Sequence, residues 1–279
     1  MKLYLKTNDF FLTEESFELV YDEDLDMLVT HPKPKNLDKY YRSEQYISHT
    51  DQTATVADRL YQRIKKINLR NKLALVKKNP RSRQSLLDVG AGTGDFLRYA
   101  KNRDWNVYGV EPNPQANHLA REKGLTLEHN LRDFSNHKFN TITLWHVLEH
   151  LPDLQEDIEQ LCNMLEDNGT LIIAVPNFKS YDAKHYGKFW AAYDTPRHLW
   201  HFSKTAMQKM FSKHEMDIIG VKPMWFDSFY VSLLSEEYKT GKKNWLRAFS
   251  VGLWSNIAGI FTGEFSSHIY ILQKRNTRP

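Results

Sequence analysis

Histidine side chains gather in two short segments of the sequence, and the chemistry they offer is proton transfer. His146 and His150 are four residues apart, so a helical turn would place both rings on one face, with Glu149 between them in the chain. His198 ends the run Asp-Thr-Pro-Arg-His. Because an imidazole accepts a proton near neutral pH, these three histidines are candidate catalytic residues, and His198 is a candidate general base. For His150, a structural hydrogen bond is the alternative.

Aromatic side chains surround His198. The segment 177–203 is rich in aromatic and histidine residues, a composition typical of the wall of a small-molecule pocket. We therefore predict that Trp190, Tyr193, Arg197 and His198 contact a substrate, with Arg197 as an anion contact. The alternative is a loop brace, in which Arg197 pairs with a local carboxylate.

A second group of residues surrounds three alternating glycines. Residues 86–94 read Leu-Leu-Asp-Val-Gly-Ala-Gly-Thr-Gly, an apolar run that ends in a tight turn, and a helix start follows. Glycine permits backbone angles that a Cβ forbids, and it lets a ligand lie against the main chain. The spacing G-x-G-x-G differs from the dinucleotide fingerprint G-x-G-x-x-G. Such turns hold adenine-containing cofactors at the carboxyl end of an open α/β sheet.

Two acids beside this turn narrow the choice of cofactor. Asp88 stands two residues before the first glycine, where a carboxylate would repel a pyrophosphate but could accept a hydrogen bond from an ammonium group. Glu111 ends the next apolar run, about 20 residues on, where an acid can take both ribose hydroxyls. A ligand with an amino acid and a ribose but no phosphate satisfies both acids. S-adenosylmethionine is such a ligand.

Four stretches around these residues resemble the class I S-adenosylmethionine-dependent methyltransferases in sequence and in order. They are Leu86–Phe96, Val107–Pro114, Thr141–Asp153 and Gly169–Asn177. The run Phe189–Ser203 is similar to the methyltransferase domain 23 branch, which is related to the ubiquinone-type O-methyltransferases. The resemblance covers residues 40–275, and it implies the fold and the cofactor more firmly than the substrate.

The resemblance also implies which residues hold the cofactor. The amides around Gly90–Gly94 would approach its methionine half, Asp88 would lie near its ammonium group, and Glu111 would take its ribose. Residues 130–134 would pack beside the adenine, and Tyr46 and His49 would close the site, unless the tyrosines of this region only pack in the core. The predicted cofactor-binding residues are Asp88, Gly90, Ala91, Gly92, Gly94, Phe96, Glu111, Pro112, Leu131, Asp133, Trp145, His146 and Tyr46.

A metal site is not predicted. Glu149 and His150 match the Leu-Glu-His piece of the ubiquinone-type enzymes, some of which hold a divalent ion there, but His146 replaces the acid that precedes this piece. One or two ligands do not make a site. The one cysteine, Cys162, excludes a disulfide framework and a cysteine-based zinc site, and its helical surroundings predict a small core residue.

The elements that would position these residues alternate along the chain. Strands are predicted at about 85–89, 106–110, 125–129, 140–145 and 170–175, and helices at about 95–103, 114–123 and 153–166. Such alternation builds right-handed βαβ units and a parallel sheet. Residues 217–221 and 268–273 would be the last two strands. By resemblance, the fold is a Rossmann-like α/β methyltransferase with helices on both faces of a seven-stranded sheet, in the order 3-2-1-4-5-7-6 with an antiparallel edge.

The pattern predicts additions to this core. A small β-rich lead occupies residues 1–36, with strands at 17–20 and 27–30, and the methyltransferase domain occupies 37–279. Some related enzymes carry a cysteine-bearing zinc ribbon at this place, so the lead resembles a metal-free remnant of that module. Aromatic-rich insertions interrupt the domain at 177–203 and 224–262. Within the second insertion, residues 244–262 form either a peripheral membrane contact or a lid or dimer helix.

Composition bounds the remaining choices. The 279 residues are 41% hydrophobic, enough to bury a full core. The net charge of +4 is too small to imply nucleic-acid binding, although the stretch from Lys65 to Arg83 holds eight basic residues and no acid. That stretch overlaps a predicted helix at 54–78, and it is either a solvated helix face or a patch for nucleic acid or membrane. Because no signal peptide or membrane-spanning stretch is visible, we expect a soluble, cytoplasmic protein.

The predicted reaction is methyl transfer from a sulfonium, an in-line displacement on a carbon that the positive sulfur activates. The protein must align a nucleophile, remove its proton where necessary and exclude water. The aromatic-rich insertions predict a small aromatic or lipid-like acceptor, methylated on oxygen in preference to nitrogen or carbon. One alternative is a methyltransferase that acts on RNA or protein. Another is a non-catalytic binding protein that retains the cofactor pocket.

Overall fold

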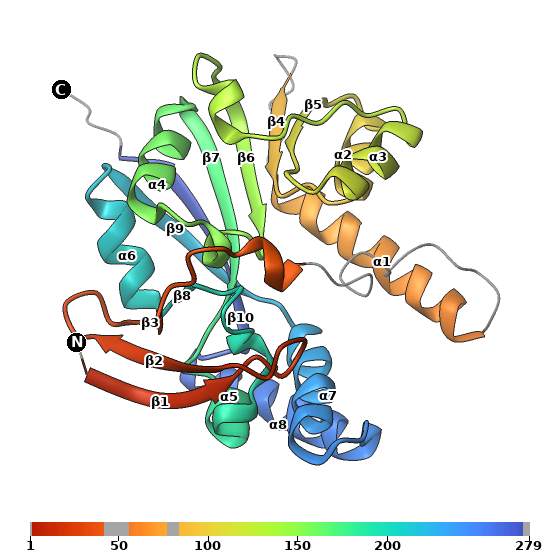
Figure 1. The fold of residues 1–279 in the computed structure, drawn as a ribbon. Helices are drawn as coiled ribbons and strands as arrows, with labels where there is room; N and C mark the ends of the chain where they lie inside the picture. The colour runs from red at the N-terminus through yellow and green to blue at the C-terminus, as the bar shows by residue number, and fades with distance from the viewer. Residues whose placement is uncertain (1, 42–55, 77–83, 276–279) are drawn as a thin grey trace. The chain divides into compact units, whose positions relative to one another are not determined.

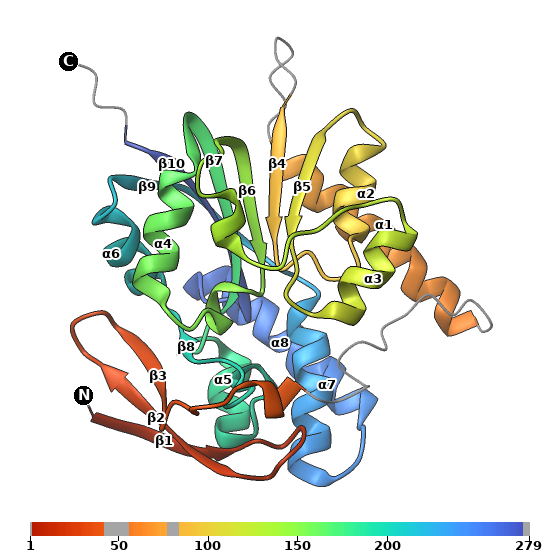
Figure 2. The same cartoon turned by 45° about the horizontal axis from the view of Figure 1, so that its top comes forward.

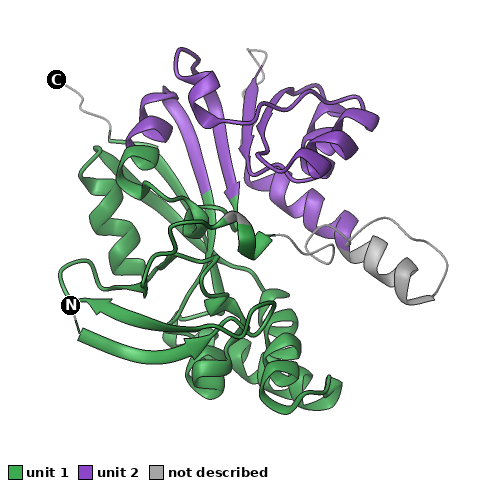
Figure 3. Cartoon of the chain, viewed as in Figure 1, with its two compact units in different colours: residues 1–42, 145–158, 173–279 green, residues 43–144, 159–172 purple. Residues whose placement is uncertain are grey.

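The computed structural model describes residues 2–41, 56–76 and 84–275. The chain divides into two compact units (Figure 3). The first unit comprises residues 1–42, 145–158 and 173–279, and the second unit comprises residues 43–144 and 159–172. Tyr46 and His49, which were predicted to close the cofactor site, lie outside the described residues.

The larger sheet carries the predicted α/β core, and its strand order is β5-β4-β6-β7-β10-β9 (Figures 1 and 2). β4 pairs in parallel with β5 and β6, while β9 and β10 pair antiparallel. The α/β fold class and the antiparallel edge are thus confirmed. The strand bounds are β4 Ser85–Val89, β5 Asn106–Val110, β6 Phe139–Trp145, β7 Leu165–Pro176, β9 Met216–Pro223 and β10 Ser267–Lys274.

The predicted strand at 125–129 is reduced to a single bridge, between Val110 and Glu128. The Glu128 amide donates to the Gly109 carbonyl at 2.9 Å, and the amide of the residue after Val110 donates to the Glu128 carbonyl at 2.8 Å. Next to this bridge, the side chain of Asn117 donates to the Leu127 carbonyl at 3.0 Å. The described residues therefore form six strands in this sheet where seven were predicted.

Three helices of the second unit accompany β4 and β5: α1 Val56–Leu75, α2 Asp95–Lys101 and α3 Pro114–Glu122. α3 begins where Asn113 caps it, since the Asn113 side chain accepts hydrogen bonds from the amides of Gln115 and Ala116. Pro114 occupies the first turn, where its missing N–H costs nothing. A further helix, α4 Leu154–Asn163, contains the buried Cys162, as predicted.

The lead at the N-terminus forms a second, four-stranded sheet in the order β1-β2-β3-β8. Its strands are β1 Lys2–Asn8, β2 Ser16–Asp22, β3 Met27–His31 and β8 Trp200–His201. The strands predicted at 17–20 and 27–30 are confirmed as β2 and β3. β8 belongs to the insertion at 177–203 and pairs antiparallel with β3, with Leu28 opposite His201. The lead and this insertion therefore share one sheet.

The first unit contains four helices beyond its strands, namely α5 Tyr181–Tyr186, α6 Lys204–Ser212, α7 Asp227–Thr240 and α8 Trp245–Thr262. Its core joins side chains of β2 and β3 to those of α5, α7 and α8, with Trp190 and Tyr193 among the buried members. Among the described helices, none combines the length and the hydropathy that crossing a bilayer needs.

Candidate functional site

The glycine turn follows β4 in the second unit. Gly90, Gly92 and Gly94 have positive φ angles of 71°, 54° and 75°, which L side chains disfavour. The amides of Gly90 and the next residue both donate to the Val110 carbonyl, which fastens the turn to the end of β5. A Cβ on Gly94 would lie 2.4 Å from Cδ1 of Leu125, whereas a Cβ on Gly92 would meet nothing within 4 Å. Gly92 therefore leaves room for a ligand to approach the main chain.

Glu111 follows β5 and contacts the turn. Its Oε2 accepts a hydrogen bond from the Gly92 amide at 2.7 Å, and its Oε1 accepts one from the Asn113 amide at 2.9 Å. The residue is only 8% exposed, and burial raises the pKa of its carboxyl although these two bonds oppose the shift. Each carboxylate oxygen has a second lone pair. Glu111 can therefore accept two more hydrogen bonds, as many as the two hydroxyls of a ribose donate.

Asp88 is buried near the carboxyl end of β4. Its Oδ1 accepts a hydrogen bond from the Thr143 hydroxyl at 2.5 Å. Burial raises the pKa of Asp88 to about 7, although the Thr143 bond acts in the opposite direction. A desolvated carboxylate is stabilised by any cation that reaches it. Asp88 therefore has the electrostatic properties expected of a residue that receives an ammonium group.

The other predicted cofactor residues differ in exposure. Asp133 lies in the 3₁₀ turn Leu131–Phe134, and its Oδ2 accepts a hydrogen bond from the Asn130 amide at 3.2 Å as part of a capping box. One carboxylate oxygen of Asp133 is thus already engaged in its own turn. Phe96 and Leu131 are buried, Ala91 and Trp145 are half-buried, and Pro112 is exposed.

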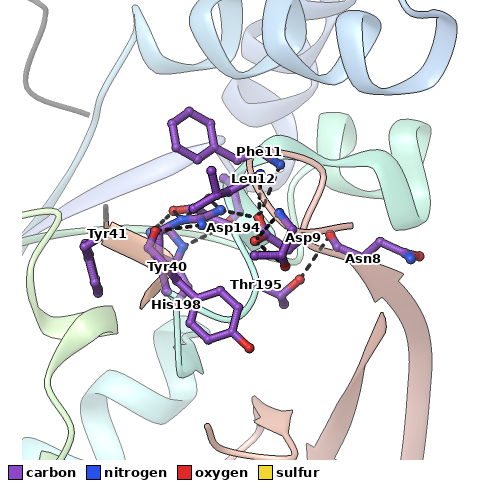
Figure 4. A network of polar contacts seen from close by, with 12 residues as sticks. Asn8, Asp9, Phe11, Leu12, Tyr40, Tyr41, Asp194, Thr195 and His198 are labelled. Carbon is purple, nitrogen blue, oxygen red and sulfur yellow. Dashed lines mark hydrogen bonds and ion pairs between the residues drawn. The ribbon is translucent and has the colours of Figure 1, made fainter. Parts of the chain in front are cut away.

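In the first unit, Arg197 is the centre of a buried polar network (Figure 4). Its guanidinium donates to Asp194 from Nε at 3.0 Å and from Nη2 at 2.6 Å, and to Asp9 from Nη2 at 2.8 Å. Its Nη1 donates to the Tyr40 carbonyl at 3.2 Å. The guanidinium carbon lies 4.8 Å from the centre of the Phe11 ring, and Arg197 is 1% exposed.

This network favours the alternative that Arg197 is a loop brace. The carboxylates of Asp194 and Asp9 already pair with the guanidinium, and contact with a substrate anion stays a prediction. Trp190 and Tyr193, which were predicted to line a substrate pocket, are each only 2% exposed and pack in the core. The Trp190 Nε1 donates to Asp182 at 2.8 Å. These two aromatic side chains contribute to the core of the first unit, and their contact with a substrate stays a prediction.

His146 follows β6 directly and has a positive φ of 58°. Its Nε2 lies 3.0 Å from a carboxylate oxygen of Asp227, and its Nδ1 lies 3.3 Å from Oε1 of Glu149. Burial lowers its pKa, but the two carboxylates outweigh burial and raise the pKa of His146 to about 10. An imidazolium has no lone pair with which to accept a proton. The structure therefore supports no role for His146 as a base near neutral pH, and its catalytic role stays a prediction.

His150 and His198 lie edge to face, with ring centroids 4.5 Å apart. Nδ1 of His150 lies 3.1 Å from the Arg197 carbonyl, and Nδ1 of His198 lies 2.9 Å from the Ala192 carbonyl. Because a carbonyl oxygen only accepts, the contact with Ala192 places a proton on Nδ1 of His198. Nδ1 of His150 also lies 3.0 Å from the hydroxyl of Tyr41, which can donate or accept. Burial and the neighbouring His198 lower the pKa of His150 to about 4. The ring of His150 is therefore neutral at pH 7, and one of its two nitrogens carries a lone pair.

Glu149, His150 and His198 bring three donor atoms within 4.8 Å of one another. Glu149 is 1% exposed, and its Oε2 has no hydrogen-bond partner among the described residues. One carboxylate and two imidazoles suit zinc and other first-row divalent ions, and catalytic zinc sites take three protein ligands. These residues fit a divalent ion, although the sequence predicted no metal site. The third donor, His198, comes from an insertion that sequence spacing does not connect to Glu149.

Three side chains of these networks were missed by the sequence analysis. Asp227 pairs with His146, Asp9 pairs with Arg197, and Thr143 donates to Asp88. Thr143 lies in the family-like stretch Thr141–Asp153 but was not singled out, and Asp227 and Asp9 belong to none of the four stretches. The positive φ of His146 and the long separation between Asp9 and Arg197 are visible only in the folded chain.

Comparisons with known proteins agree with this arrangement. A family described as a methyltransferase domain matches residues 58–219. An uncharacterized methyltransferase of Anoxybacillus flavithermus is 28% identical over 146 residues, which cover 46% of this chain and 68% of that protein. A ubiquinone biosynthesis O-methyltransferase of Actinobacillus pleuropneumoniae is 31% identical over 108 residues, which cover 34% of this chain and 46% of that protein. The chain thus spans less than half of the second relative.

The fold is also found in solved structures. The mycolic acid cyclopropane synthase CmaA1, determined in complex with SAH and CTAB, matches with a TM-score of 0.56 at 14% identity. The match covers 85% of this chain and 94% of that protein. The shared architecture therefore extends well beyond the segment that the family matches.

Proposed function

The chain belongs to the methyltransferase-domain family and uses S-adenosylmethionine as its methyl donor, and on that premise we propose that it methylates an oxygen atom of a small aromatic or lipid-like acceptor. The observation that carries the donor side of this proposal is the geometry of Glu111. Its carboxylate is oriented by two backbone amides, from Gly92 and Asn113, and it retains two acceptor positions for a ribose.

The proposal gives the other residues of the turn matching roles. Asp88 takes the ammonium group of the donor, because its buried carboxylate gains most from a cation. The open position at Gly92 lets the main chain approach the methionine half of the donor. The protein then has little covalent chemistry to perform, since the sulfonium already activates the methyl carbon, and it accelerates the reaction mainly by alignment and exclusion of water.

Proton removal favours oxygen as the methylated atom. A hydroxyl must lose its proton as it attacks, and the neutral ring of His150 has a nitrogen that can accept one. His198 carries its proton on Nδ1, so its Nε2 makes it the second candidate base. A divalent ion held by Glu149, His150 and His198 would lower the pKa of a bound hydroxyl.

The nature of the acceptor rests on sequence likeness to one relative. The Actinobacillus pleuropneumoniae protein is an O-methyltransferase of ubiquinone biosynthesis, and 31% identity over 108 residues supports a related kind of acceptor. Trp190 and Tyr193 are buried, so the support for this class of acceptor comes from the relative and not from these two side chains.

A basic groove in the second unit favours a second candidate function, methylation of RNA or of an acidic protein. The groove is lined by residues of α1, of α2 and of the turn after α2, five of which are basic: Lys65, Lys66, Arg70, Arg98 and Arg103. Asp95 pairs with Lys65 at 2.7 Å and offsets part of this charge. If RNA binds here, its affinity falls steeply with salt concentration. An RNA affinity that does not change with salt concentration would exclude RNA methylation at this groove.

The proposed reaction is tested by incubating the full chain with S-adenosylmethionine and a panel of phenols, catechols and hydroxylated lipids. We expect S-adenosylhomocysteine release with at least one of these acceptors, and mass spectrometry would show a methyl ether. Parallel calorimetry measures binding of S-adenosylmethionine. Binding without turnover, both on this panel and on RNA or protein substrates, would favour a non-catalytic binding protein. Turnover only on RNA or protein would favour the second function.

A further inference from the structure

The outward side of α8 carries large apolar side chains that the described part of the chain leaves uncovered. Trp245, Leu246, Phe249, Leu253, Ile260 and Phe261 are all exposed, and Leu246 and Phe261 each expose 84% of their surface. We define these six residues as the α8 apolar face. With about 3.6 residues per turn, all six fall on one half of the helix. Soluble chains rarely present such a continuous apolar surface without a partner.

The opposite side of α8 packs within the first unit through small residues. A Cβ on Gly252 would lie 2.8 Å from the ring of Phe229 in α7, and a Cβ on Gly259 would lie 2.6 Å from the ring of Phe265. Ala248 and Ser255 are buried on the same side. α7 and α8 lie side by side in Figures 1 and 2. The usual pattern of a packed helix is therefore reversed, because the small residues face inward and the large apolar ones face outward.

Charge is distributed unevenly around this face. α8 contains one charged residue, Arg247, and no acid. The end of α7 and the turn after it carry the exposed residues Lys239, Lys242 and Lys243. Glu236 pairs with Arg247 at 3.1 Å and Glu237 pairs with Lys243 at 3.6 Å. Lys239 and Lys242 remain available at one end of the apolar face.

We propose that the α8 apolar face docks onto the surface of a lipid bilayer that contains anionic lipids. The six apolar side chains enter the boundary between headgroups and acyl chains, while Lys239 and Lys242 contact anionic headgroups. An 18-residue helix is about 27 Å long and lies in the plane of such a surface. Trp245 is suited to this boundary because an indole is amphipathic. The docking does not depend on the identity of the methyl acceptor.

Charge complementarity favours a bilayer over a second copy of the chain. In an antiparallel contact between two copies, the basic end of one α8 would meet the carboxyl end of the other. The acid at that end, Glu264, already pairs with Lys204 at 3.2 Å, so it offers the lysines little attraction. Anionic headgroups supply negative charge along the whole helix, and each nearby lysine strengthens the binding.

The proposal is tested by co-sedimentation of the full chain with vesicles of phosphatidylcholine, with or without phosphatidylglycerol. We expect binding to the anionic vesicles that weakens at high salt. The double variant Leu246→Glu/Phe261→Glu should reduce the binding roughly tenfold or more, because it removes the two most exposed apolar side chains. A second double variant, Lys239→Glu/Lys242→Glu, should reduce binding to the anionic vesicles and remove most of its salt dependence.

Ile219→Glu is the matched control, because Ile219 is a half-exposed apolar residue on β9 outside the face. It should bind vesicles as the parent chain does, and thermal unfolding should show all variants folded. The proposal is overturned if the parent chain binds no vesicle, or if Leu246→Glu/Phe261→Glu binds as well as the parent. Sedimentation velocity tests whether a second copy of the chain binds the α8 apolar face instead. A dimer that this double variant dissociates, without vesicle binding by the parent, would assign the face to a second copy.

Discussion

The imidazole of His146 lies 3.0 Å from the carboxylate of Asp227, the first residue of α7. Glu149 holds the other nitrogen of the same ring at 3.3 Å. A residue that follows a strand of the larger sheet is thus tied to the start of the helix pair α7 and α8. The two carboxylates raise the pKa of His146 and keep its ring protonated near neutral pH. The charged ring then stabilises the fold through its ion pairs with Asp227 and Glu149.

The first prediction concerns the pH dependence of this ion pair. The pKa of His146 is raised from 6.5 to about 10, so the pair stabilises the fold fully below pH 6.5, and its contribution is lost as the pH rises through about 10. Solvent screens the pair, because its side chains are 33% and 22% exposed. We expect Asp227→Asn to lower the free energy of unfolding by about 1 kcal/mol near pH 6.5, and by much less above pH 10. Urea unfolding at the two pH values measures this difference, and an equal loss at both would contradict the assignment.

The second prediction concerns the ribose contact. Glu111→Gln replaces one acceptor oxygen by an NH₂ group, which only donates and cannot accept from a backbone N–H or from a ribose hydroxyl. We expect the affinity for S-adenosylmethionine to fall by about tenfold or more, the cost of losing hydrogen bonds to a charged group. Calorimetry measures the affinity, and Glu128→Gln is the control, because Glu128 is an exposed acid near the same edge. Equal affinities of the two variants would remove Glu111 from the cofactor site.

The third prediction uses the titration of Asp88. Its pKa of about 7 lies above the ordinary value, so the ionised fraction grows between pH 6 and pH 7.5. Because only the carboxylate attracts an ammonium group, the affinity for S-adenosylmethionine should rise by roughly five- to tenfold over that range. Asp88→Asn should bind weakly with no such rise, whereas Asp133→Asn should retain it. A rise that persists in Asp88→Asn would assign it to another group.

The fourth prediction separates catalysis from binding at the paired histidines. We expect His150→Ala and His198→Ala to lower turnover by about 10²-fold or more if either ring accepts the acceptor proton. The affinity for S-adenosylmethionine should change much less than the turnover. His118→Ala is the control, since the side chain of His118 is 71% exposed. If both histidine variants turn over as the parent does, neither ring takes part in proton transfer.

The fifth prediction tests the brace at Arg197. Lysine cannot reproduce the fork that donates to Asp194, Asp9 and the Tyr40 carbonyl, so Arg197→Lys leaves buried acceptors without donors. We expect this variant to lower the free energy of unfolding by about 3 kcal/mol or more. Arg275→Lys is the control, because Arg275 also pairs with an aspartate but lies at the surface. A raised KM with unchanged stability would instead indicate that Arg197 contacts a substrate.

The strand bounds and the glycine turn depend on residues that are adjacent in the sequence, and these features were predictable from the sequence. β4, β5 and β6 lie within one residue of their predicted bounds, since each is an apolar run that ends at a polar or glycine signal. The glycine turn was predictable because G-x-G-x-G requires the positive φ angles that the structure shows. The position of Glu111 beside the glycine turn was predictable, because the carboxyl ends of the parallel strands β4 and β5 lie at the same edge of the sheet.

The sequence alone therefore determined the class of fold and the position of the glycine turn beside Glu111, because those features follow from spacing along a few dozen residues. Only the tertiary structure decided that Asp9 pairs with Arg197, that Asp227 stabilises the protonated form of His146 and that β8 pairs with β3. It also decided that Trp190 and Tyr193 are buried. The physical reason is that a charged or aromatic side chain takes its role from its partners. Those partners lie far away in the sequence and become neighbours only when the chain has packed.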